Sequence, residues 1–491
     1  MARHPIADTG AARTLGKALR DVGYSEEAIT ELLGDEAYSS RAGDVPISAR
    51  RLSRSKLDSV VRLLFLQLPL PVDDAIAALG PRGVDALAAT ALADVDGKAV
   101  VPRARLLPIG ELLVAADNDL DEDGHGAPDY VAGYTPTSQL CDSLTPRRRV
   151  SRALDVGTGS GVQALLAAAH AREVVATDVN PRALAYTELN AALNGLSNIE
   201  CRSGSLFEPV ADETFDLITC NAPYVVSPEH RWAYRDGGLG GDELSQQLVG
   251  TAAAHLADDG FATLLVSWIA PDEDSSVERP LEWLEPLDCD GWILPIWESD
   301  ALEHAATWND HLVDDSVQLG DALDAWTEYL TAIGAHWIGE GAVVLHRRPA
   351  PHSIRVDWVD ADELEDAGDQ ILRAFDARER LAGLGRKREL LDRRVSLAAS
   401  LKLAQDLRRR DGRNRVFAAE IQLDEGTHSL VETAPDVLDV VAALDGSRRV
   451  GDVVDSVARK RRLSERESTR LRRRTQRVVR ELLELGALRF E

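Results

Sequence analysis

The chain has 491 residues, with 55 Lys and Arg against 82 Asp and Glu, which gives a formal net charge of −27. A single hydrophobic core rarely serves more than about 250–300 residues, so we expect about three domains. So acidic a chain excludes a protein that coats nucleic acid or an anionic membrane with its whole surface. Any such contact must be local.

The cysteines and the N-terminus indicate a reduced, soluble protein. Four cysteines lie far apart and form no CxxC pair, so we expect neither a disulfide framework nor a metal site. The first twenty residues contain no apolar signal core, and no apolar run of 18 residues occurs anywhere. We therefore expect a cytoplasmic protein with no membrane contact.

Residues 1–116 are predicted to form a helical accessory domain. Leu57–Leu68 and residues 72–93 carry apolar side chains at the three- and four-residue spacing of amphipathic helices. The stretch GKAVVPRARLLPI, residues 97–109, is predicted to be a short hairpin. Helices followed by a hairpin indicate a winged-helix-like domain, and a small helical domain without a ligand is the alternative.

Residues 117–129 are predicted to be an acidic linker. Asp119, Asp121, Asp123 and Gly124 alternate as they do in an EF-hand loop. Tyr130, however, stands where that loop needs a bidentate glutamate. A solvated linker is therefore the better interpretation.

Residues 130–350 are predicted to form an α/β domain with a mostly parallel sheet. Short apolar strands alternate there with amphipathic segments. The predicted strands are ALDV, EVVATD, NIECRS, FDLITC, FATLLVSW and GAVVLHRR. Residues 270–335 give no clear pattern.

The C-terminal part is predicted to be helical and rich in arginine. Residues 351–431 are expected to be a helical connector, and residues 432–491 a second winged-helix-like domain with three helices and a closing strand. Between Arg459 and Arg480 there are eleven basic and two acidic residues. This run predicts a solvated helix face or one that neutralises the protein's own acidic surface, with nucleic-acid binding as the alternative.

The sequence ALDVGTGSGVQALL predicts a nucleoside-binding turn between a strand and a helix. Gly157, Gly159 and Gly161 permit a tight turn and close approach of a ligand. Asp178 ends the next strand, where its carboxylate can accept both ribose hydroxyls. A dinucleotide site would need a glycine at Val162.

With Asp155 ahead of the glycines, the turn resembles that of the class I S-adenosylmethionine-dependent methyltransferases. The resemblance implies a Rossmann-like fold and S-adenosylmethionine as cofactor. Ser205 stands where an Asp of that family commonly meets the adenine amino group. The cofactor-binding residues implied are Asp155, Gly157, Thr158, Gly159, Gly161, Asp178, Val179, Ser205, Leu206 and Asn221.

Asn221-Ala222-Pro223-Tyr224, at the end of a predicted strand, indicates chemistry on a planar nitrogen. The nitrogen of an amide or exocyclic amine attacks poorly until its hydrogens are held and its lone pair is directed at the methyl group. The Asn221 side-chain oxygen and the Ala222 carbonyl can each accept one N–H, and Tyr224 offers a flat face. These four residues are the predicted catalytic residues.

The tetrapeptide and its surroundings resemble the HemK-type glutamine-N5 methyltransferases and their NPPY-type motif. In that family an aromatic and glycine-rich loop follows the motif, and an aromatic-and-proline segment, here 130–144, closes over the cofactor. The resemblance implies substrate contacts from Tyr134, Pro136 and Tyr224. Ala222 replaces the first family proline.

The resemblance predicts methylation of a protein glutamine, such as one in a translation release factor. The alternatives are an RNA or DNA methyltransferase acting on adenine N6 or guanine N2, a small-molecule methyltransferase, and a non-catalytic cofactor-binding regulatory protein. The exocyclic amine of adenine or guanine, as a methyl acceptor, needs the same two groups to accept its N–H hydrogen bonds. Two winged helices and a basic helix would also suit binding to RNA.

Overall fold

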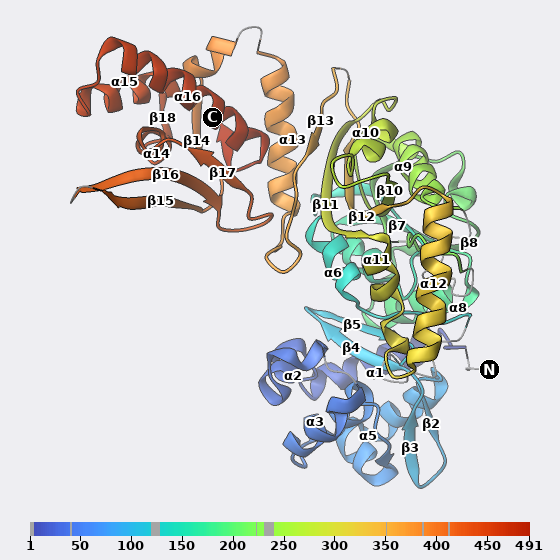
Figure 1. The fold of residues 1–491 in the computed structure, drawn as a ribbon. Helices are drawn as coiled ribbons and strands as arrows, with labels where there is room; N and C mark the ends of the chain where they lie inside the picture. The colour runs from blue at the N-terminus through green and yellow to red at the C-terminus, as the bar shows by residue number, and fades with distance from the viewer. Residues whose placement is uncertain are drawn as a thin grey trace. The chain divides into compact units, whose positions relative to one another are not determined.

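The computed structural model describes residues 4–39, 42–118, 128–221, 223–229, 240–349, 351–384, 387–410 and 413–491. The chain divides into two compact units (Figure 1). Unit 1 holds Met1–Cys141, Arg148–Leu287 and Trp297–Val343. Unit 2 holds Asp142–Arg147, Asp288–Ile296 and Val344–Glu491. No helix within the described ranges is long and apolar enough to cross a membrane.

Unit 1 begins with helices that pack on one apolar core. In α1 (Thr9–Asp21) the buried positions include Ala12, Leu15 and Leu19, the spacing of one helix face, and Asp8 caps the first turn. The following helices are α2 (Glu26–Leu33), η1 (Asp35–Ser39), η2 (Ala42–Asp44), α3 (Val45–Arg51), α4 (Lys56–Val60), the π-helical η3 (Val61–Phe65) and α5 (Val72–Ala89).

The N-terminal strands form two hairpins rather than the one predicted. In the first, β2 (Ala93–Val95) pairs with β3 (Ala99–Pro102), and β1 (Leu70–Pro71) adds to its edge. In the second, β4 (Arg105–Ile109) pairs with β5 (Leu112–Ala116). The prediction of a single hairpin over residues 97–109 is wrong, because β3 and β4 each pair with a different neighbour. The winged-helix assignment stays a prediction.

The predicted α/β fold with a mostly parallel sheet is confirmed. Unit 1 contains strands in the order β12-β10-β9-β6-β7-β8, and the pairs among β10, β9, β6, β7 and β8 are parallel. All six predicted strands are present: β6 (Val150–Val156), β7 (Ala171–Asp178), β8 (Ile199–Ser203), β9 (Phe215–Cys220), β10 (Leu256–Ala270) and β12 (Trp337–His346). Helix α6 (Pro136–Ser143) precedes these strands, and among the helices between them are α7 (Val162–Ala168), α8 (Pro181–Leu193), η5 (Glu208–Val210), α9 (Glu243–His255) and α10 (Glu278–Leu284).

The strand order identifies where a ligand would bind. The chain runs outward from β6 through β7 to β8 and then crosses back to β9 on the other side of β6. In open α/β sheets, ligands bind beyond the carboxyl ends of the strands at such a switch point. The glycine turn follows β6, and Asn221 follows β9, so both lie at this point.

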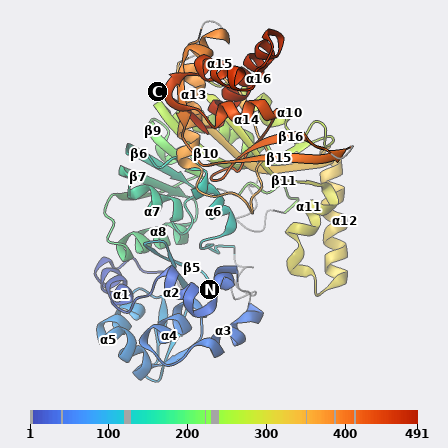
Figure 2. The same cartoon turned by 90° about the vertical axis from the view of Figure 1, so that its left-hand side faces the viewer.

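The stretch that gave no sequence pattern contains a pair of helices. After β11 (Asp290–Asp300), the chain forms α11 (Ala301–Trp308), η6 (Asp310–Leu312) and α12 (Ser316–Ala332). Figure 2 shows α11 and α12 side by side. Val225 lies in one apolar cluster with Ala305 and Trp326, so the helix pair packs against the segment that follows β9.

Helix α8 joins the N-terminal strands to the sheet domain within unit 1. The side-chain amide of Asn190 bonds both N–H and C=O of Ala115 at 2.8 Å, and that of Asn194 bonds both groups of Leu113 at 2.9 and 2.8 Å. Four helical residues rise about 6 Å and two strand residues about 6.7 Å, so the two repeats match. These amides act as a strand partner for the free edge of β5.

Unit 2 combines helices with small sheets. Its elements are β13 (Ile354–Val356), α13 (Gly368–Ala382), η7 (Lys387–Asp392), β14 (Arg394–Leu397), β15 (Leu401–Arg410), β16 (Arg413–Leu423), β17 (Leu430–Thr433), α14 (Pro435–Val441), β18 (Asp445–Arg449), α15 (Val450–Lys460), α16 (Glu465–Glu484) and β19 (Leu488–Phe490). The three helices and closing strand expected after residue 432 are present.

The prediction of a helical connector over 351–431 is wrong in its second half. Residues 394–433 supply β14 and the antiparallel sheet β15-β16-β17. Leu401 and Leu403 alternate with polar residues at strand spacing, but the arginines that follow obscure this pattern.

Candidate functional site

The glycine turn after β6 has the backbone geometry that glycine permits. Gly157, Gly159 and Gly161 have φ values of +66°, +56° and +86°. Gly161 lies directly before α7, and a Cβ there would approach the Thr187 side chain to 2.9 Å. The predicted turn is therefore present, with one glycine required by close packing as well as by φ.

The Asp155 carboxylate stabilises the glycine turn through hydrogen bonds. Its carboxylate accepts hydrogen bonds from Thr158 Oγ1 at 2.7 Å, Thr219 Oγ1 at 3.0 Å and the backbone N of Ala164 at 3.1 Å. The side chain is buried, and burial raises its pKa to about 6. Asp155 thereby links the turn to α7 and β9.

Asp178 lies at the end of β7 and faces the same turn. Its Oδ2 accepts the Gly159 N–H at 3.0 Å, and its Oδ1 accepts the Asn180 N–H at 2.8 Å. Burial raises the pKa of this carboxyl. Because each carboxylate oxygen has a second lone pair, the group can still accept two hydroxyls.

Asn221 begins the segment that leaves β9. Its Nδ2 donates to Thr137 Oγ1 at 3.4 Å, and among the described residues its Oδ1 accepts no hydrogen bond. Thr137 Oγ1 in turn lies 3.0 Å from Thr135 Oγ1. The Asn221 amide is thus held by its nitrogen, and its oxygen is available to an incoming N–H.

Tyr224 is buried beside Asn221 and remains a neutral phenol. Burial and the nearby Glu340 carboxylate raise its pKa well above the usual value. Its backbone carbonyl accepts a hydrogen bond from Ser267 Oγ. Ala222, between Asn221 and Pro223, lies outside the described residues.

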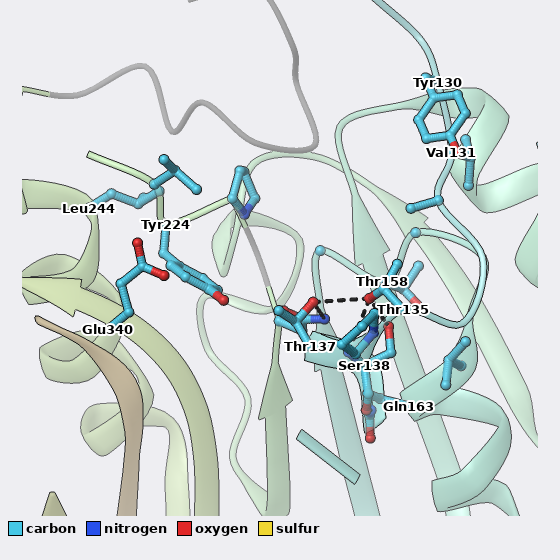
Figure 3. Close-up of a pocket in the computed structure, with 18 of the residues that line it drawn as sticks. Tyr130, Val131, Thr135, Thr137, Ser138, Thr158, Gln163, Tyr224, Leu244 and Glu340 are labelled. Atoms are coloured by element: carbon cyan, nitrogen blue, oxygen red, sulfur yellow. Dashed lines mark hydrogen bonds between the residues drawn. The ribbon is translucent and has the colours of Figure 1, made fainter. Parts of the chain in front are cut away.

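These groups line one cavity of about 1320 Å³. Asp178 and the glycine turn contribute to the lining, as do Asn221 and Tyr224. Figure 3 shows Tyr224 beside Glu340 on one side of this cavity, and Thr135, Thr137 and Ser138 on the other. A nucleoside site and a planar-nitrogen site therefore share one space.

Comparison with known families and proteins identifies the central domain. Residues 135–267 match the family described as methyltransferase small domain. This chain contains a HemK-like class I methyltransferase domain. Residues 21–103, outside the methyltransferase match, fit a domain of unknown function (DUF7059).

Two curated relatives are about a third identical to this chain over the aligned residues. The ribosomal protein uL3 glutamine methyltransferase of Bradyrhizobium diazoefficiens is 33% identical over 220 residues, covering 42% of this chain and 63% of that protein. The release factor glutamine methyltransferase of Xylella fastidiosa is 35% identical over 130 residues, covering 24% and 47%. The chain thus spans less than two thirds of the length of either relative.

Two solved structures similar to part of this chain are at most about a fifth identical to it. The YcgJ protein from Bacillus subtilis is 16% identical, covers 44% of this chain and 99% of its own, and gives a TM-score of 0.30. The ribosomal protein L11 methylase from Lactobacillus delbrueckii is 21% identical, with 41% and 71% covered and a TM-score of 0.23.

Most residues predicted for the methyltransferase site line the cavity. They are Pro136, Asp155, Gly157, Thr158, Gly159, Asp178, Val179, Ser205, Leu206, Asn221, Pro223 and Tyr224. Gly161 lies directly before α7 and is not among the lining residues. Tyr134 packs instead against the N-terminal apolar core.

One wall of the methyltransferase cavity was missed by sequence reasoning. It is built from the end of β11, from α11 and from β12, and its residues include Trp297, Glu298, Glu303, His304, Trp308 and Glu340. Glu340 Oε1 accepts the Trp308 indole N–H at 3.0 Å and lies 3.4 Å from His304 Nδ1. The abundance of Trp and acidic residues in 270–335 was the only sequence signal for this wall.

The cavity lining is acidic. Its carboxylates are those of Asp155, Asp178, Glu298, Glu303 and Glu340. Among the described lining residues there is no lysine or arginine. Such a lining favours neutral or cationic ligands and disfavours phosphate groups.

Proposed function

We propose that this protein transfers a methyl group from S-adenosylmethionine to the side-chain nitrogen of a glutamine in another protein. The observation that carries the proposal is the position of the Asn221 amide oxygen. It accepts no hydrogen bond among the described residues, and it lines the same cavity as Asp178. The names of the curated relatives support the glutamine acceptor.

The residues present fit the proposed cofactor. The Asp178 carboxylate would accept the ribose hydroxyls, and Val179 and Leu206 offer apolar contacts to a base. A Cβ on Gly159 would meet no atom within 4 Å, so this turn leaves open space beside its backbone. The acidic lining suits a ligand that carries a sulfonium and an ammonium group.

When bound, S-adenosylmethionine would supply a methyl group on its sulfonium. The acceptor nitrogen would take this methyl as the sulfur–methyl bond breaks, the sulfur would leave as a neutral thioether, and one N–H proton would pass to solvent. Asn221 would accept one amide N–H and so direct the nitrogen lone pair. The Ala222 carbonyl is the proposed acceptor for the second N–H. Tyr224, neutral and buried, would stack on the planar amide. The chain then contributes positioning and electrostatics rather than a strong base.

The acidic wall supports a protein acceptor over a nucleic acid. A nucleic acid whose base enters this cavity would bring phosphates close to a lining that carries Glu298 and Glu303, and like charges repel. A glutamine side chain is neutral, and a basic peptide around it would be attracted. Ribosomal protein uL3 and release factors are the acceptors to test first, and either would place the reaction in the cytoplasm.

The test is a methylation assay with the full chain and methyl-tritiated S-adenosylmethionine. Purified uL3, a purified release factor and total RNA are offered separately, and the products are digested with protease or with nuclease. We expect label in one protein, located by mass spectrometry to a glutamine and lost when that glutamine is changed to asparagine. Label that only nuclease releases would overturn the proposal.

A further inference from the structure

The basic run near the C-terminus forms an exposed row of arginines. Helix α16 buries Leu471, Val478, Leu482 and neighbours within unit 2. Arg466, Arg470, Arg473 and Arg477 are spaced by four, three and four residues, and all four are exposed. At 100° per residue they share one face, roughly opposite the buried one.

Only part of this positive charge is neutralised by the protein itself. Arg461, Arg472, Arg474 and Arg480 form ion pairs with Asp439, Asp455, Asp436 and Glu484. Seven basic residues of the run are exposed and make no ion pair with any described residue: Arg459, Lys460, Arg462, Arg466, Arg470, Arg473 and Arg477. Ion pairs with described residues therefore involve only four of the eleven basic residues of the run.

We propose that this arginine face of α16, with the cations at the end of α15, binds the phosphate backbone of RNA. Arg466 to Arg477 span about 16 Å along a rigid helix, which presents guanidinium groups at fixed intervals. Guanidinium groups bind phosphate in a fork geometry. On a chain of net charge −27, an RNA strand meets attraction at this face and repulsion over most of the remaining surface.

The chemistry of the face favours nucleic acid over an acidic protein. Protein interfaces are anchored by buried aromatic and aliphatic side chains. The larger apolar side chains of α16, such as Leu471, Val478 and Leu482, are buried, so the exposed row offers charge without an apolar anchor. Contacts of this kind are electrostatic and salt-dependent, as phosphate contacts are.

The choice of RNA over DNA rests on the proposed function, because acceptors from the translation machinery are found beside RNA. The phosphate-binding face itself is independent of that choice. Binding can be measured without cofactor or acceptor protein, so its failure would be distinct from a failure to methylate.

The test is fluorescence anisotropy with the full chain and a short labelled single-stranded RNA of mixed sequence, between about 0.05 and 0.2 M salt. The variant carries Arg466→Gln, Arg470→Gln, Arg473→Gln and Arg477→Gln, which keep good helix formers. The control removes four exposed charges from unit 1 by Arg13→Gln, Lys17→Gln, Arg54→Gln and Lys56→Gln. Circular dichroism verifies that both variants fold.

We expect the α16 variant to bind RNA at least about tenfold more weakly, with the slope of log affinity against log salt reduced by roughly 2 to 4. The control should bind like the unmodified chain. Equal losses in both variants, no RNA binding by the unmodified chain at low salt, or tighter binding to DNA of the same sequence would each overturn the proposal.

Discussion

Asp178 Oδ2 and the backbone N of Gly159 are joined by a hydrogen bond of 3.0 Å. This bond ties the end of β7 to the glycine turn after β6, beside the point where the strand order reverses between β6 and β9. The carboxylate proposed to hold the ribose therefore also fixes the turn that approaches the rest of the cofactor. Both functions depend on one side chain.

We expect Asp178→Ala to weaken S-adenosylmethionine binding by about 10- to 150-fold, because a hydrogen bond to a charged group contributes about 1.5–3 kcal/mol. Isothermal titration calorimetry measures the change. Glu200→Gln on β8 is the control, since Glu200 pairs with Arg202 and is absent from the cavity lining. Equal affinity in the Asp178 variant and the unmodified chain would remove Asp178 from the site.

Asn221→Ala should lower the methylation rate without weakening cofactor binding. Because its oxygen is proposed to hold the acceptor nitrogen, we expect turnover to fall by roughly 10²-fold or more while cofactor affinity changes little. Asn221→Asp keeps an acceptor oxygen of the same reach and should lose less. Turnover of the alanine variant within a factor of two of the unmodified chain would sink the assignment of this motif.

Gly161→Ala tests the packing of the turn. The alanine would have to adopt a φ of +86°, and its Cβ would lie 2.9 Å from the Thr187 side chain. We therefore expect the free energy of unfolding to fall by about 2–3 kcal/mol. Gly195→Ala, at φ +69° with no atom within 4 Å, should lose only about 1 kcal/mol. Urea unfolding measures both. If the two glycines respond alike, close packing at Thr187 is not what requires Gly161.

The buried Asp155 should make stability depend on pH. Burial raises its pKa to about 6, so the folded chain holds the proton more tightly than the unfolded chain. This contribution is complete below about pH 4 and is lost as the pH rises through about 6. The unmodified chain should therefore lose about 2–3 kcal/mol relative to Asp155→Asn between pH 4 and 7.

Unfolding of both proteins at each pH checks this, because groups common to both cancel in the difference. Asp212→Asn, at an exposed position, is the matched control. A difference between the unmodified chain and Asp155→Asn that stays constant from pH 4 to 7 would show that Asp155 does not titrate in this range.

The part of the candidate site at the ends of the parallel strands could be predicted from the sequence. Asp155 lies within a parallel strand, while Gly157, Asp178 and Asn221 end or follow one, and parallel strands end at one edge of a sheet. Local sequence therefore determines where they meet. The same reasoning gave the six strands of unit 1, since each is a short apolar run between turns.

The cavity wall built from the end of β11, from α11 and from β12 could not be predicted from the sequence, because these elements meet only through packing. Trp308 and Glu340 are joined by a hydrogen bond at a separation of 32 residues, and neither belongs to a recognisable motif. Tyr134 also illustrates this, since the family resemblance implied a substrate contact, whereas in the structure the residue packs against the N-terminal core. Neighbouring residues on an irregular segment can face different environments.

The side-chain amides of Asn190 and Asn194 determine how far the N-terminus of this protein can be truncated without loss of structure. The family match begins at residue 135, which invites expression of the methyltransferase segment alone. Removing residues 1–116 would strip β5 from α8 and leave four amide hydrogen bonds and an apolar helix face open to water. Asn190 also donates to the Ser160 carbonyl at 2.8 Å, so the loss would reach the glycine turn. We therefore expect that a segment beginning at residue 135 will not fold stably without residues 1–116.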